Sequence, residues 1–193
     1  MLRSLYDWTM RLAAHRTAPW ALTVVSFIES SVFPIPPDVL LIPMVLADRA
    51  KAWFYASICT IASVLGGLLG YLIGLLLFET IGRMLLNFYG YVAKFEQFAG
   101  LYNEWGAWIV FIAGVTPFPY KVITIASGVT QLDLAVFMIA SVLARGARFF
   151  AVAALLYFFG PSIRSFIERR LGLIAAVSMA LLLGGFVLVR LLG

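Results

Sequence analysis

The sequence predicts an all-α, polytopic integral membrane protein with two inverted re-entrant hairpin-plus-transmembrane-helix repeats and an additional C-terminal transmembrane helix. Three observations support this fold class. Hydrophobic residues make up 63% of the 193 residues and charged residues 12%, against roughly 25% charged residues in soluble domains. Long runs without charge alternate with short polar turns. Two of the apolar stretches are interrupted by closely spaced prolines.

Residues 1–19 predict an amphipathic helix on the bilayer surface, because apolar side chains recur there at helical spacing among charged ones. No small-residue cleavage site ends the first apolar run, so we expect no removable signal peptide. The single histidine, His15, and the single cysteine, Cys59, form no metal-binding pattern. We therefore expect no metal and no cofactor.

Residues 20–78 predict a first hairpin followed by a helix. Prolines lack the backbone donor that a helix needs and clash with the preceding turn, and three of them break the apolar run: Pro34, Pro36 and Pro37. The helix must restart around Asp38, and each arm is shorter than the about 20 residues that span hydrocarbon. A broken tip at membrane depth is tolerated only where protein or a wet cavity surrounds it, so the hairpin points to a site.

Residues 53–78 carry no charge and are the clearest transmembrane helix in the sequence. Gly66, Gly70 and Gly74 fall four residues apart and give this helix a smooth face that another helix can approach closely. We expect this face to pack against the first hairpin. A dimer interface is the alternative.

The second half repeats this layout. Residues 79–105 are amphipathic and rich in aromatic residues, which predicts an interfacial segment or, alternatively, the lining of a lipid headgroup groove. Residues 106–160 predict the second hairpin and helix, with breaks at Pro117 and Pro119. A last transmembrane helix is expected at 171–192.

The basic residues predict the orientation. If both hairpins return to the side from which they entered, most arginines and lysines gather on one side, which is then cytoplasmic. The N-terminus is expected on that side. The residues gathered there are Arg3, Arg11, Arg16, Arg49, Lys51, Arg164, Arg169 and Arg170.

Five ionisable residues lie within apolar segments: Glu29, Asp38, Lys121, Arg145 and Arg148. Each would cost about 2.5 to 3.5 kcal/mol at the centre of a membrane helix unless it pairs, changes protonation or faces water. Three cations against two acids leave one positive charge, which favours an anion, and guanidinium groups recognise phosphate well. The alternative is a buried ion-pair network that only locks the hairpins together.

Two segments resemble a known family. ESSVFPIPPD, which begins at Glu29 and ends at Asp38, and the glycine-rich GGLLGYLIG resemble the DedA family of bacterial inner-membrane proteins, also called the SNARE-associated Golgi or VTT-domain group. TPFPYK is similar to its YqaA-like branch, and the resemblance covers roughly residues 20–160. The resemblance implies two opposed re-entrant hairpins. It also implies that the protein moves a lipid, either undecaprenyl phosphate or a phospholipid, across the bilayer.

By position, Glu29 and Asp38 match the membrane-embedded acids that the family is thought to use in proton coupling. Many members carry an Arg-Phe-x-Pro-x-x-Arg pattern in the second hairpin, whereas this chain has Lys121 near the second arginine and no basic residue near the first. We expect Arg145 and Arg148, which share a helix face, to supply the missing charge.

The leading hypothesis is a flippase or scramblase of the bacterial inner membrane, and not an enzyme. Lys121, Arg145 and Arg148 would hold an anionic lipid phosphate, and Glu29 and Asp38 would link its passage to protons. The expected partners are membrane lipids and protons, with a homo-oligomer left open and nucleic acid excluded. The alternative is a non-transporting scaffold or envelope-integrity protein. A lipid-phosphate enzyme is disfavoured, because the apolar segments contain no histidine and no metal-binding motif.

Overall fold

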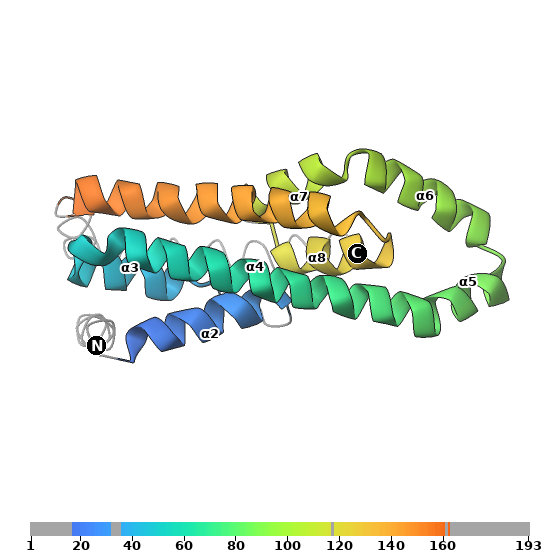
Figure 1. Ribbon diagram of the computed structural model, residues 1–193, viewed down its shortest axis with the longest axis horizontal. Coiled ribbons are helices and arrows are strands. Elements are labelled where there is room, and N and C mark those ends of the chain that lie inside the picture. The colour runs from blue at the N-terminus through green and yellow to red at the C-terminus, as the bar shows by residue number, and fades with distance from the viewer. Residues whose placement is uncertain (1–16, 32–35, 117, 161, 163–193) are drawn as a thin grey trace, which may run out of the picture.

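The computed structural model describes residues 17–31, 36–116, 118–160 and 162, and the regular elements within these ranges are all helical (Figure 1). This confirms the all-α prediction. The elements are α2 (Ala18–Ser31), α3 (Asp38–Ala47), η1 (Arg49–Lys51), α4 (Ala52–Leu77), η2 (Phe78–Gly82), α5 (Arg83–Tyr89), α6 (Val92–Glu104), α7 (Gly106–Val115), α8 (Tyr120–Val129) and a helix at Leu134–Gly160.

Two helices are long and apolar enough to cross a membrane, Arg49–Tyr89 and Leu134–Gly160. They lie side by side and run in opposite directions (Figure 1). Trp53 near the start of α4 stacks on Phe150, with ring centroids 6.1 Å apart, and Tyr71 further along α4 packs against Phe137 at 5.2 Å. The segments 1–16 and 171–192, which contain most of the predicted surface helix and the last predicted span, lie outside the described residues.

The first long helix continues beyond its predicted end. A π-helical segment, η2, joins α4 to α5, so the helical backbone runs on through Glu79 and Arg83 to Tyr89. These two charged side chains form an ion pair with a distance of 3.0 Å on the exposed surface. Pairing one turn apart lets a helix carry both charges without a break.

The helix breaks occur at the prolines. Helix α2 ends at Ser31 and α3 begins directly after Pro37, while α7 ends at Val115 and α8 begins directly after Pro119. Pro34 and Pro117 lie outside the described residues. The four helices have 14, 10, 10 and 10 residues, about 15 to 21 Å each. None of them is long enough to cross about 30 Å of hydrocarbon by itself.

The two broken helix pairs occupy opposite halves of the molecule. Figure 1 shows α2 and α3 beside the half of α4 that follows η1, and α7 and α8 near its other half. Helix α7 also contacts the Leu134–Gly160 helix, because Gly114 lies against Ala144. The described helix ends that flank the two breaks lie near the middle of the bundle, where Arg148 contacts both Asp38 and Thr116.

One helix of each broken pair packs against the glycine face of α4. A methyl group added to Gly66 would collide with the backbone of Phe27 in α2, and one added to Gly74 would collide with the backbone of Ile125 in α8. Between them, Gly70 lies against Thr124, whose hydroxyl donates to the carbonyl of Ser30 at 3.2 Å. The absence of side chains lets the ends of α2 and α8 approach one another across α4.

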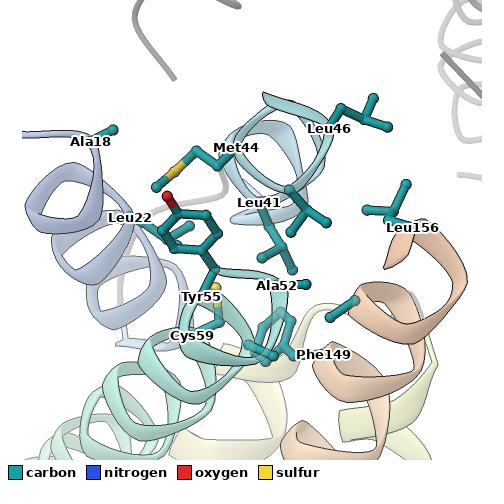
Figure 2. Close-up of a cluster of buried hydrophobic side chains, with 13 residues drawn as sticks. Ala18, Leu22, Leu41, Met44, Leu46, Ala52, Tyr55, Cys59, Phe149 and Leu156 are labelled. Carbon is teal, nitrogen blue, oxygen red and sulfur yellow. The ribbon is translucent and has the colours of Figure 1, made fainter. Parts of the chain in front are cut away.

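Two apolar clusters pack on either side of a polar layer. Figure 2 shows the first, in which Leu22, Leu41, Tyr55 and Phe149 join α2, α3, α4 and the Leu134–Gly160 helix. The second cluster contains Tyr71, Val110, Tyr120 and Phe137. The stretches of α4 and of the Leu134–Gly160 helix between these two clusters carry the buried polar side chains Ser63, Ser141 and Arg145.

The glycine packing predicts opposite outcomes for the same substitution at two sites. Gly74→Ala places a methyl group on the backbone of α8, so we expect a loss of about 1 to 3 kcal/mol of stability from overpacking. Gly100→Ala in α6 meets nothing within 4 Å and should be neutral or stabilising by up to about 1 kcal/mol through helix propensity. Thermal unfolding of both purified variants in detergent measures this. Equal stability of the two variants would contradict the close α4–α8 contact.

Candidate functional site

Two ion pairs join the Leu134–Gly160 helix to the first broken helix pair. Arg145 Nη2 lies 2.9 Å from Glu29 Oε2 on α2, and Arg148 Nη2 lies 2.5 Å from Asp38 Oδ2 at the first residue of α3. The arginines are three residues apart, so they share one face of their helix. They occur at the twelfth and fifteenth positions of its 27 residues, close to its centre.

Two nitrogens of Arg145 take part in a closed ring of hydrogen bonds. Its side chain is 1% exposed, and Nε donates to the Ser63 hydroxyl at 2.5 Å. The Ser63 and Ser30 hydroxyl oxygens are 2.6 Å apart, and the Ser30 hydroxyl donates to the same Glu29 oxygen at 3.1 Å. The four side chains form a ring of contacts that fixes Glu29 and Arg145 together.

Aromatic rings complete the surroundings of Arg145. The guanidinium carbon lies 4.9 Å from the centre of the Tyr120 ring and 4.7 Å from that of Phe149, within the range of attractive cation–π contacts. The buried Tyr120 hydroxyl donates to Ser141 at 2.5 Å. This bond holds the Tyr120 ring in place beside the arginine.

The second pair is more accessible and has fewer partners. The side chains of Arg148 and Asp38 are 20% and 21% exposed. Arg148 Nη1 donates to the carbonyl of Thr116 at 3.2 Å. Asp38 follows the first proline break and Thr116 precedes the second, so this one guanidinium group contacts both broken helix pairs.

Two buried polar atoms of the site have no hydrogen-bond partner among the described residues: Asp38 Oδ1 and Arg145 Nη1. Buried polar groups are satisfied in the great majority of cases. A carboxylate oxygen can take up a proton, and a guanidinium N–H can donate to an anion. The described part of the chain contains no group of three or more His, Cys, Asp or Glu side chains that could hold a metal ion.

Four of the five charged residues selected from the sequence thus meet in two adjacent pairs. The fifth, Lys121, follows Tyr120 in the first turn of α8, is half-buried, and accepts a hydrogen bond at its carbonyl from Thr124 at 2.9 Å. In the chain, Lys121 follows the second proline break, whereas Thr116 precedes it.

Sequence reasoning missed the polar partners of these charges. Ser30 adjoins Glu29, and Ser63 lies one turn before Gly66 on the close-packed face of α4. Both serines could have been found as the small polar residues nearest to a buried charge or to the glycine face. The roles of Tyr120 and of the Thr116 carbonyl have no sequence signal, because they depend on how α7 and α8 meet the Leu134–Gly160 helix.

The family model for the VTT domain matches residues 35–158, a range that includes Asp38, both arginines and the second break and begins after Glu29. The chain is 41% identical over 152 residues to an uncharacterized protein of Haemophilus influenzae, and 40% identical over 152 residues to one of Histophilus somni. Each alignment covers 79% of both chains. No solved structure matches the chain. With the match extending over well over half of its length, the chain belongs to the VTT-domain family of membrane proteins, the DedA and SNARE-associated group.

Proposed function

We propose that this protein is a membrane lipid transporter. It moves the phosphate headgroup of an anionic lipid, such as undecaprenyl phosphate or a phospholipid, through the region where the two broken helix pairs meet. The acyl or isoprenoid chains remain in the bilayer. The observation that carries the proposal is the Arg148–Asp38 pair, which is central in an apolar helix, partly accessible and in contact with both breaks.

The chemistry of this pair suits a phosphate. A guanidinium group donates several hydrogen bonds in one plane and binds phosphate oxygens in a bidentate manner. Ionisable residues within membrane segments mark transport pathways more often than they serve packing alone. Lys121 at the start of α8 supplies a third cation on the far side of the second break.

The two arginines have different roles in this mechanism. Arg145 is held by Glu29, Ser63 and two aromatic rings, so it contributes a fixed positive charge and an Nη1 group that has no hydrogen-bond partner among the described residues. Arg148 has one carboxylate and one carbonyl as hydrogen-bond partners, and its guanidinium carbon lies 6.0 Å from the centre of the Phe149 ring. Arg148 is therefore the group that can exchange Asp38 for a phosphate during each transport event.

Asp38 links this exchange to protons. When Asp38 takes up a proton, its attraction for Arg148 falls and the guanidinium group can bind phosphate; when the proton leaves, the carboxylate competes with the phosphate. A headgroup would then bind on the proton-rich side and leave on the proton-poor side. Without this linkage the same route would act as a scramblase.

The broken helix pairs form the route as two inverted re-entrant hairpins, entering from opposite membrane faces. The N-terminus and the Arg49 end of α4 face the cytoplasm of a bacterial cell. Arg49 donates to the carbonyl of Tyr157 at 3.3 Å, so the start of the first span and the end of the second lie at one membrane face. This shared face fits the positive-inside rule.

A structural role is the second candidate function. The closed ring of contacts around Arg145 is the arrangement that a purely stabilising charge network would have. In that case the protein is a scaffold or envelope-integrity protein, and the Arg148–Asp38 pair only clamps the hairpins together.

The transporter proposal predicts a large effect of Arg148→Gln. Loss of a charge-assisted hydrogen bond of about 1.5 to 3 kcal/mol should slow headgroup translocation about tenfold or more. Translocation of labelled undecaprenyl phosphate and of labelled phosphatidylglycerol in proteoliposomes measures the rate. Arg83→Gln, which breaks the exposed pair with Glu79, is the matched control and should keep the wild-type rate. An unchanged rate in Arg148→Gln would exclude Arg148 as the phosphate group.

Asp38→Asn should remove the dependence of translocation on a pH gradient. Asparagine resembles the protonated acid at every pH, so Arg148 stays available on both sides. In the wild-type protein an acidic exterior should speed movement toward the alkaline interior. The control is Asp48→Asn, which removes an exposed partner of Lys51 and should respond as the wild type does. If Asp38→Asn kept the full gradient response, Asp38 would not be the coupling group.

A charge exchange separates transport from a structural clamp. The double variant Asp38→Arg with Arg148→Asp keeps an ion pair but moves the cation from the centre of the long helix to α3. The transporter proposal predicts a folded protein with translocation reduced about tenfold or more. Complete activity of the exchanged protein in cells and in proteoliposomes would favour the scaffold.

A further inference from the structure

An apolar groove runs along the outer side of α7, and we call it the α7 groove. It is an open groove of about 730 Å³ between α7, α6 and α8, and its lining includes Trp105, Trp108, Ile112, Thr116 and Phe118. None of the side chains that line it is charged. A volume of this size lies within the range of small-molecule sites.

The length of the groove matches one bilayer leaflet. Trp105 precedes α7 and Thr116 follows it, and 11 residues of helix span about 16 Å. Half of the about 30 Å hydrocarbon layer is about 15 Å. The groove can therefore accommodate a hydrocarbon chain from the depth of the second proline break to the membrane interface.

Its two ends differ in chemistry. At the inner end, the carbonyl of Thr116 accepts a hydrogen bond from Arg148, so one residue of the groove lining also contacts the more accessible ion pair. At the outer end, Trp105 and Trp108 are 58% and 62% exposed, and tryptophans concentrate at membrane interfaces. A molecule with one anionic end and a long apolar body would match a groove that is cationic near one end and apolar along its length.

We infer that the α7 groove holds the hydrocarbon tail of a phosphate-bearing lipid while the phosphate lies at Arg148. This inference rests on the proposed function, because it takes the bound lipid to be the transported one. The groove cannot hold the headgroup, because it offers no charged side chain to a phosphate. The tail thus stays in an apolar environment while the phosphate is at mid-membrane depth.

Photo-crosslinking in the full-length protein tests the inference. A benzophenone amino acid replaces Ile112 in the groove or, as the control, Leu65 on α4; these side chains are 57% and 50% exposed. Both are near mid-bundle, since Ile112 is one turn from Thr116 and Leu65 is two residues from Ser63. The vesicles contain phosphatidylcholine with equal minor amounts of undecaprenyl phosphate and phosphatidylglycerol, and mass spectrometry identifies the adducts.

We expect adducts of one anionic lipid to be enriched about tenfold at Ile112 over Leu65, and the enrichment to disappear with Arg148→Gln, because one charge-assisted hydrogen bond is worth about that factor. Equal adduct patterns at the two positions would overturn the inference, as would enrichment that persists without Arg148. Crosslinks at Ile112 to another segment of the chain or to a second copy would overturn it as well.

Translocation by the unmodified protein is measured in the same vesicles, so the two proposals can fail separately. Translocation without enrichment at Ile112 rejects the groove and leaves the proposed function. Enrichment that depends on Arg148, without translocation, rejects the transport function and leaves a lipid-binding groove.

Discussion

The rest of the structure depends on the cost of placing charge at the centre of an apolar bundle. Four ionised side chains, at about 2.5 to 3.5 kcal/mol each on an insertion scale, would together cost about 10 to 14 kcal/mol if unpaired. That is comparable with the whole stability of a typical domain. The fold meets this cost by bringing each arginine of the Leu134–Gly160 helix to a carboxylate on the first broken helix pair. These contacts are possible only if α2 ends and α3 begins near the middle of the bundle.

The proline breaks and the glycine face meet this requirement together. Prolines stop the helices at mid-bundle, and the glycines of α4 let the backbones of α2 and α8 come close enough for Thr124 to bond to Ser30. Neither device would suffice alone. A break without close packing would leave free backbone groups in hydrocarbon, which is unfavourable, and close packing of unbroken helices would leave no opening for Asp38 beside Arg148.

The sequence predicted the parts of this arrangement that depend on local chemistry. Proline positions located both breaks, and the charge-free run located the first long helix, because these effects act within a few residues. The identity of each ion pair could not be predicted, since any of three cations could have met either acid. That choice is made by the register of the Leu134–Gly160 helix against α4, which is fixed by ring contacts such as Trp53 with Phe150 and Tyr71 with Phe137.

The two ion pairs differ in how readily their arginines could change partners. An ion pair that loses one partner in a fully buried position leaves a charge without compensation, at a cost of about 3 to 5 kcal/mol. Arg145 is in such a position and could not change partners readily, since every contact of its closed ring would have to break. Arg148 lies one turn away at 20% exposure, and a phosphate that replaces Asp38 would keep its guanidinium group paired throughout. The fixed pair therefore holds α2 against the Leu134–Gly160 helix, and under the proposed function the accessible pair changes partners.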